Sequence, residues 1–158
     1  EEEAIIWRGP MVHNAINQFL QSTEWGELDY LIIDLPPGTS DSPLTVMQAL
    51  TLDGFVVVTT PQELARIDAM RSINMIRTLH VSVLGVVENF SGEIFGSGAG
   101  EELAIELDLT FLGRLELRSD YRDTSKPTVL TSKLVLAEYR HIAEQVKLAL
   151  ESVAVGAA

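Results

Sequence analysis

The chain has 158 residues, 46% of them hydrophobic and none of them cysteine, and its formal net charge is −12. This composition predicts one folded domain with its own core and excludes a disordered chain. The acidic balance disfavours nucleic acid as a partner, and no apolar run reaches the ~18 residues of a membrane span. Without cysteine, the 158 residues hold no disulfide and no thiolate metal ligand. The acidic start at Glu1 has the wrong charge for a signal peptide, so we expect a cytoplasmic protein.

Helical spacing and short apolar runs alternate along the chain. In chain order, the pattern predicts a helix over 11–21, a strand over 30–34, a helix over 43–50, a strand over 54–60, a helix over 62–79, a strand over 81–89, a helix over 100–107, a strand over 110–115 and a helix over 132–153. In the last helix we expect Leu134, Tyr139, Ile142, Val146 and Val153 to face inward. The alternation predicts a single α/β domain over 1–158, with a doubly wound, mainly parallel sheet and helices on both faces.

The segment after the first predicted strand is the most informative of the chain. Asp34 ends an apolar run and is followed by Pro36, Pro37, Gly38, Thr39, Ser40 and Asp41. A carboxylate at the end of a buried parallel strand can hold Mg²⁺ beside nucleotide phosphates, although it can also be a turn or cap residue. The prolines stiffen the loop, and Gly38 permits close approach of the backbone to a phosphate. The polar groups of 39–41 could reach a γ-phosphate or its attacking water, so we predict a loop that senses this phosphate.

Polar residues also end the next two predicted strands. The hydroxyls of Thr59 and Thr60 could line a nucleotide cleft, although Thr60 could equally cap the following helix. The carboxamide of Asn89 could donate to and accept from an adenine edge, or it could open the next loop as an Asx turn. No G-x-x-x-x-G-K-[ST] loop occurs in the chain, so the usual partner of an aspartate such as Asp34 is absent.

Four sequence blocks together resemble one protein family. They are Trp7-Arg8-Gly9-Pro10-Met11, the segment from Asp34 to Asp41, Val58-Thr59-Thr60-Pro61-Gln62 and Gly85-Val86-Val87-Glu88-Asn89. These blocks resemble the Mrp/ApbC family, which are P-loop ATPases of the MinD/ParA-like class that carry and deliver iron–sulfur clusters. The resemblance extends from residue 5 to about residue 127.

The resemblance implies a role for each matching residue. Asp34 resembles the Walker B aspartate at the Mg²⁺ site, and Asp41 belongs with it as a catalytic candidate at the end of the switch loop. Pro36, Pro37, Gly38, Thr39 and Asn89 would contact the nucleotide, Asn89 at adenine. For the complete protein, the resemblance implies ATP hydrolysis with Mg²⁺, a homodimer, a [4Fe-4S] cluster held by cysteines of both subunits, and delivery to apo iron–sulfur proteins, with no nucleic acid or membrane partner.

The sequence departs from the family pattern in three places. The first strand and its P-loop are absent, so this chain alone should not hydrolyse ATP. The C-x-x-C segment is absent where Gly92 runs directly into Glu93, so these residues offer no cluster ligand. The segment from Leu115 to Arg118 replaces the family's Ile-Pro-x-Asp, which removes the expected packing against the base.

Two explanations for the absent segments stay open at this point. Either the segments belong to the protein but not to this sequence, or the polypeptide is truncated or diverged. Two other functions stay open as well: a MinD/ParA-like positioning ATPase, and a degenerate interaction module on the same fold that binds no nucleotide. The last predicted helix has no excess of basic residues, which disfavours the first of them.

Overall fold

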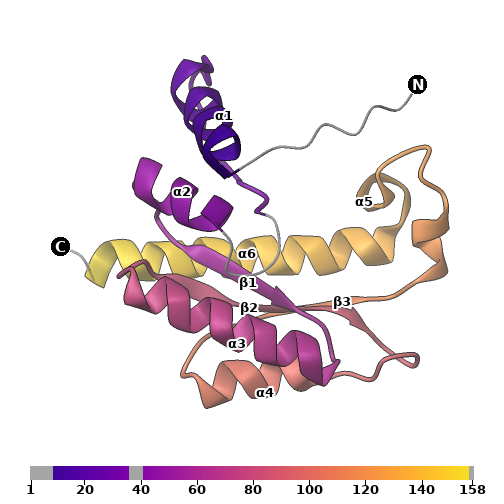
Figure 1. The fold of residues 1–158 in the computed structure, drawn as a ribbon. Coiled ribbons are helices and arrows are strands. Elements are labelled where there is room, and N and C mark those ends of the chain that lie inside the picture. Colours follow the sequence, from indigo (N-terminus) through magenta and orange to yellow (C-terminus); the bar gives the residue numbers. More distant parts are fainter. Residues whose placement is uncertain (1–8, 36–40, 157–158) are drawn as a thin grey trace. The chain divides into compact units, whose positions relative to one another are not determined.

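The computed structural model describes residues 9–35 and 41–156 (Figure 1). The chain divides into two compact units, 1–52 and 53–158, which we call unit 1 and unit 2 and describe separately. The division leaves the single domain over 1–158 as a prediction. No helix among the described residues is long and apolar enough to cross a membrane.

The described part of unit 1 forms two helices, α1 (Gly9–Ser22) and α2 (Asp41–Ala49). Both confirm helices predicted from apolar spacing. His13 on α1 shares a hydrogen bond of 3.0 Å with Thr45 on α2, through Nδ1 and Oγ1. Thr45 and Val46 are buried, so the contact between the two helices forms the small interior of this unit.

The strand predicted over 30–34 is wrong, because residues 30–35 have no regular secondary structure. A strand satisfies its backbone groups by pairing with a neighbour, and the described residues of unit 1 hold helices but no strand to pair with. The apolar side chains of this run are consequently not buried, and Ile32 is 91% exposed.

Unit 2 is built on a three-stranded parallel sheet in the order β1-β2-β3. Its strands are β1 (Phe55–Thr59), β2 (Val83–Ser91) and β3 (Phe111–Glu116), which confirm the strands predicted over 54–60, 81–89 and 110–115. Helices α3 (Glu63–Thr78) and α4 (Ala99–Glu106) cover one face, and α6 (Lys133–Gly156) covers the other (Figure 1). The short helices η1 (Ser119–Arg122) and α5 (Thr128–Thr131) connect β3 to α6. The predicted α/β class with helices on both faces is confirmed.

The core of unit 2 lies between the sheet and α3 and α4. It is formed by Val57, Ala69, Ile73, Ile76, Val86, Leu103 and Ala104. The central strand β2 is buried continuously from Leu84 to Glu88, as expected for a parallel strand that is covered on both faces. Burial of this kind stabilises by about 25 cal/mol per Å² of apolar surface, so this core holds β2 and its polar C-terminal end in place.

The inward face of α6 differs from the prediction at two positions. Leu134 and Tyr139 are exposed, whereas Val135 is completely buried. Consecutive helical residues are about 100° apart, so a helix that turns Val135 to the sheet turns Leu134 away from it. Ile142 is half-buried on the inward face, as predicted.

Candidate functional site

The C-terminal edge of the unit 2 sheet collects the polar residues that end its strands. Thr59 is buried at the end of β1, and its hydroxyl donates to the carbonyl oxygen of Thr60 at 3.4 Å. The hydroxyl of Thr60 donates to Oε1 of Gln62 at 2.8 Å. Gln62 is the residue at the N-cap position of α3, so the alternative in which Thr60 caps this helix is wrong.

Asn89 is half-buried near the end of β2, and its carboxamide is held by the adjacent backbone. Its Oδ1 accepts a hydrogen bond of 2.9 Å from the N–H of Phe90, which has a left-handed φ of 59°. An Asx turn bonds two residues ahead, whereas this bond is to the next residue. A carboxamide oxygen has two lone pairs, so the bond to Phe90 leaves capacity for an adenine amino group.

Glu88 is a buried acid for which the sequence alone predicted no role. Its side chain is 0% exposed, and its carboxylate accepts hydrogen bonds from the N–H groups of Gly98, at 3.0 Å, and Gly100, at 2.7 Å. These groups lie at the N-terminus of α4, where backbone N–H groups lack helical partners and favour negative charge. An acid inside the apolar run Val86-Val87-Glu88, followed by a Gly-x-Gly, was the signal that could have predicted this bond.

The loop between β2 and α4 is closed where the family pattern has its cysteines. Gly92 and Gly96 exchange two backbone hydrogen bonds of 2.8 Å each. Both glycines have positive φ values, 125° for Gly92 and 80° for Gly96, which L side chains rarely adopt. The sequence Glu93-Ile94-Phe95 is therefore the tip of a tight loop, which we call the loop tip.

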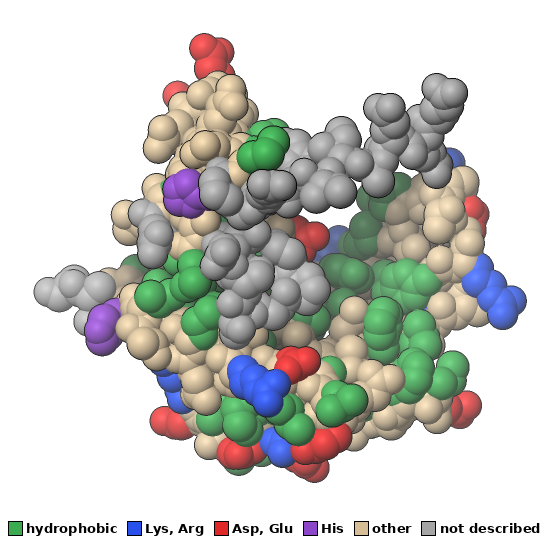
Figure 2. Space-filling view, viewed as in Figure 1, with side chains coloured by type: hydrophobic (Ala, Val, Ile, Leu, Met, Phe, Trp, Pro, Cys, Tyr) green, Lys and Arg blue, Asp and Glu red, His purple; other side chains and the backbone are tan. Residues whose placement is uncertain are grey.

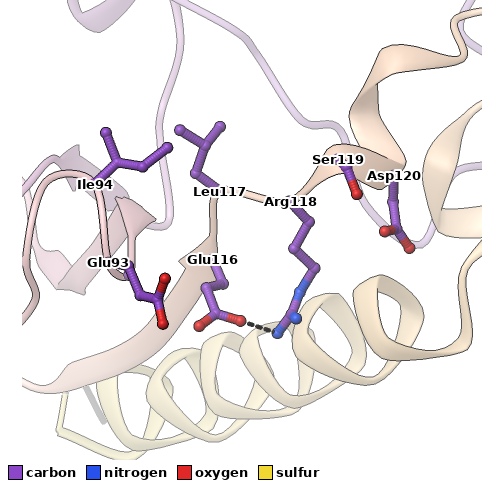
Figure 3. Close-up of a pocket in the computed structure, with 8 residues that line it drawn as sticks. Glu93, Ile94, Glu116, Leu117, Arg118, Ser119 and Asp120 are labelled. Atoms are coloured by element: carbon purple, nitrogen blue, oxygen red, sulfur yellow. Dashed lines mark ion pairs between the residues drawn. The ribbon is translucent and has the colours of Figure 1, made fainter.

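An open hollow of about 350 Å³ lies between the loop tip and the segment after β3 (Figure 3). It is lined by Gly92, Glu93, Ile94, Glu116, Leu117, Arg118, Ser119 and Asp120. Arg118 forms ion pairs with Glu116 and, at 2.6 Å, with Glu138 of α6. The hydrogen bond to Glu138 raises the pKa of Arg118, so the guanidinium stays charged. The segment that replaces Ile-Pro-x-Asp thus anchors the end of β3 to α6.

The other predicted site residues belong to unit 1. Asp34 is exposed, and Asp41 is the first residue of α2. Pro36, Pro37, Gly38 and Thr39 lie outside the described residues. Asp34 and Asn89 belong to different units, so their joint role at a nucleotide stays a prediction.

The side chains of the described residues are compatible with binding Mg²⁺ but not with binding an iron–sulfur cluster. No cluster of three or more His, Asp or Glu side chains that could hold a metal occurs in 9–35 and 41–156. Mg²⁺ is commonly bound through one or two carboxylates together with substrate phosphates, and an exposed Asp34 fits that role. An iron–sulfur cluster takes thiolates, and the chain has no cysteine, so its residues do not fit a cluster.

The sequence profile of the ParA family described as NUBPL iron-transfer P-loop NTPase matches residues 1–147. The chain belongs to the iron-transfer P-loop NTPase family. An iron-sulfur cluster carrier protein of Methanocaldococcus jannaschii is 42% identical and covers 92% of this chain and 55% of its own length. One of Escherichia coli K12 is also 42% identical and covers 92% of this chain and 44% of its own length. The resemblance to Mrp/ApbC proteins is confirmed, and the chain spans about half the length of the curated relatives it matches.

Two solved structures share the fold of this chain over most of its length. A nucleotide-binding protein of Archaeoglobus fulgidus in complex with ADP is 33% identical, with a TM-score of 0.62 over 89% of this chain and 53% of its own. The cell division ATPase MinD of Pyrococcus furiosus has a TM-score of 0.66 over 91% of this chain and 62% of its own, at 18% identity, and supports the fold alone.

The alignments also bear on the absent segments. The alignment with the Methanocaldococcus relative is 160 residues long, but it includes only 92% of the 158 residues of this chain. The relative therefore has residues within the aligned region that have no counterpart here.

Proposed function

We propose that the complete protein is an iron–sulfur cluster carrier whose nucleotide switch includes this chain. The observation that carries the proposal is the match of the iron-transfer P-loop NTPase profile to 1–147, a range that includes the segment from Asp34 to Asp41. The similarity to an ADP-bound nucleotide-binding protein supports a nucleotide site on the same fold. Because the chain spans about half of its curated relatives, the activity is assigned to the complete protein.

In this proposal, unit 1 supplies the residues that respond to the γ-phosphate. Asp34 would hold Mg²⁺, directly or through water, and Asp41 would orient the attacking water from the start of α2. Pro36, Pro37, Gly38 and Thr39 would approach the phosphates, where the two prolines limit the loop to few conformations. Bound ATP with Mg²⁺ would supply the phosphoryl transfer, and loss of the γ-phosphate would remove the contacts that these residues make with it.

Unit 2 would contribute the base contact. The bond from the N–H of Phe90 fixes Oδ1 of Asn89, so the carboxamide is already oriented before a base arrives. A side chain that is fixed in advance loses less conformational entropy on binding. The P-loop with its lysine would come from a part of the protein outside these residues.

The iron–sulfur cluster is the cargo of the proposed carrier. Its thiolate ligands would come from residues outside this chain, at a homodimer interface, and its recipients would be apo iron–sulfur proteins. A [4Fe-4S] cluster and a cytoplasmic location belong to the same proposal.

The proposal is tested by nucleotide binding and cluster uptake of the complete protein. We expect Asn89→Ala to weaken binding of a fluorescent ADP analogue about tenfold, as for loss of one or two hydrogen bonds. Asn74→Ala is the matched control, because Asn74 is an exposed asparagine of α3 away from the strand ends. Anaerobic incubation with iron and sulfide should then produce a chromophore that can be transferred to an apo acceptor protein.

The competing function is a nucleotide-free interaction module. It is favoured by two sequence facts, the absence of a Walker A loop and the absence of cysteine. A complete protein that binds no nucleotide and acquires no cluster would establish the module and overturn the carrier.

A further inference from the structure

The loop tip presents apolar side chains at one end of the unit 2 sheet. Ile94 is 72% exposed, Phe95 is 42% exposed, and Phe90 before the loop is 45% exposed. Hydrophobic side chains gather on the side of the molecule where this loop and the end of β3 lie (Figure 2). Contiguous apolar surface on a folded protein commonly marks a site of interaction.

The apolar surface is held on a fixed support. The paired hydrogen bonds between Gly92 and Gly96 close the loop at its neck. The carboxylate of Glu88 fixes Gly98 and Gly100 at its far end. Because both ends are fixed, a partner that contacts the loop tip loses little free energy to ordering it.

The hollow beside the loop tip is acidic on one side and apolar on the other. Figure 3 shows Ile94 and Leu117 extending to one side of the backbone, and the carboxylates of Glu93 and Glu116 extending to the opposite side. The lining holds three carboxylates, Glu93, Glu116 and Asp120, and one guanidinium, Arg118. That guanidinium is engaged by Glu116 and Glu138, so the hollow keeps an excess of negative charge.

We propose that the loop tip and this hollow dock a segment of a partner protein in which a lysine or arginine lies next to an apolar side chain. The basic group would bind among Glu93, Glu116 and Asp120, and the apolar group would pack on Ile94 and Leu117. The net charge of −12 strengthens the attraction of a basic partner at long range and repels polyphosphate backbones. The docking surface is formed by residues of unit 2 alone, and its test requires neither nucleotide nor cluster.

The experiment uses the protein labelled with ¹⁵N and three synthetic peptides. The first peptide alternates lysine with leucine, the second alternates glutamate with leucine, and the third alternates lysine with serine. We expect the lysine–leucine peptide to shift the amide signals of 92–95 and 116–120. It should bind at least about tenfold more tightly than the other two peptides. The lysine–serine peptide lacks the apolar contact of a leucine, and the glutamate–leucine peptide lacks the attraction between opposite charges.

Two pairs of variants test the two sides of the hollow. Ile94→Ser should weaken the lysine–leucine peptide about tenfold, whereas Ile105→Ser, at a residue of α4 that is 75% exposed, should not change it. Glu93→Gln with Asp120→Asn should weaken it about fivefold at low salt, whereas Glu144→Gln on α6 should not. The dispersion of the amide spectrum shows directly whether each variant is folded.

Three results would overturn the proposal. The first is amide shifts that map away from the loop tip and the hollow. The second is equal binding of the lysine–leucine and glutamate–leucine peptides. The third is folded Ile94→Ser protein that binds the lysine–leucine peptide as tightly as the unmodified chain.

Discussion

The Oε2 atom of Glu88 lies 2.7 Å from the backbone nitrogen of Gly100 and accepts its hydrogen bond inside the protein. Glu88 is part of β2 and Gly100 is part of the first turn of α4, so one carboxylate joins the central strand to the helix that follows it. The backbone N–H groups of Gly98 and Gly100 replace the hydrogen bonds to water that the carboxylate of Glu88 loses on burial. This bond also fixes the far end of the loop whose tip carries the proposed docking surface.

We expect Glu88→Gln to lower the free energy of unfolding by about 2 kcal/mol. Glutamine keeps one acceptor oxygen but turns an amino group toward the N–H donors of Gly98 and Gly100. Urea denaturation measures the change, and Glu102→Gln on the exposed first turn of α4 is the matched control. Because an exposed charge near a helix N-terminus contributes about 0.5 kcal/mol, equal losses in the two variants would contradict a special role for Glu88.

A second prediction concerns the sign of Gly100→Ala. Alanine in a helix is ordinarily more stable than glycine by about 0.5–1 kcal/mol. Here an added Cβ would lie 2.8 Å from Cβ of Glu88 and 3.3 Å from Cγ2 of Thr59. We therefore expect Gly100→Ala to destabilise the protein by about 1–3 kcal/mol, as overpacking does. A stabilised variant in thermal denaturation would show that α4 does not approach β2 this closely.

The ion pairs of Arg118 provide a third prediction. Arg118 and Glu138 are each mostly buried, with 25% and 21% of their side chains exposed. Arg118→Gln leaves the Glu138 carboxylate without its partner, and we expect a loss of about 2 kcal/mol in urea denaturation. Arg71→Gln breaks the pair with Asp68, which is exposed on both sides, and should change stability by less than about 1 kcal/mol. A similar loss in both variants would mean that Arg118 does not anchor β3 to α6.

The pKa of Asp123 provides a prediction in the acid range. The hydroxyl and the backbone N–H of Ser125 hydrogen-bond the carboxylate and lower the pKa of Asp123 below its ordinary value of 3.8. A carboxyl whose pKa is lowered by folding stabilises the fold above its unfolded pKa, and this contribution is lost as the pH falls through the lower, folded value. An NMR titration of the carboxyl carbon should give a midpoint below 3.8, and Ser125→Ala should move the midpoint upward. A midpoint that is unchanged in Ser125→Ala would show that the hydroxyl of Ser125 does not lower the pKa of Asp123.

The sequence predicted the elements of unit 2 because each of them has strong local periodicity. Strands β1 and β2 contain runs of β-branched apolar residues, and β3 is a short apolar run. Each strand has a neighbour in the sheet, and α3 and α4 bury apolar residues against it. In unit 2 the secondary structure favoured by the local sequence is also the one that packs into the core. Under this condition the sequence pattern predicts secondary structure well. The inward face of α6 was predicted less well, since apolar residues occur all around that helix and only packing selects Val135 over Leu134.

The run over 30–34 shows where this reasoning is insufficient. Its composition is typical of a buried parallel strand, but a strand needs a partner, and periodicity does not show whether one is available. Asp34 and Asn89 are predicted as site residues because each follows an apolar run, and their roles stay predictions. The sequence signal for Glu88 is different: it is an acid inside an apolar run with a Gly-x-Gly further along the chain. Its partners are backbone N–H groups that the folded loop brings to it.

The rate of Mg·ATP turnover by the complete protein tests the central proposal most directly. Asp34→Asn removes the charge proposed to hold Mg²⁺, and Asp29→Asn removes another exposed charge of the same unit and serves as the control. We predict that Asp34→Asn lowers kcat at least about a hundredfold, as for loss of several kcal/mol of transition-state stabilisation, while Asp29→Asn leaves kcat unchanged. Turnover by Asp34→Asn at the rate of the unmodified protein would contradict the role given to Asp34 and the nucleotide switch built on it.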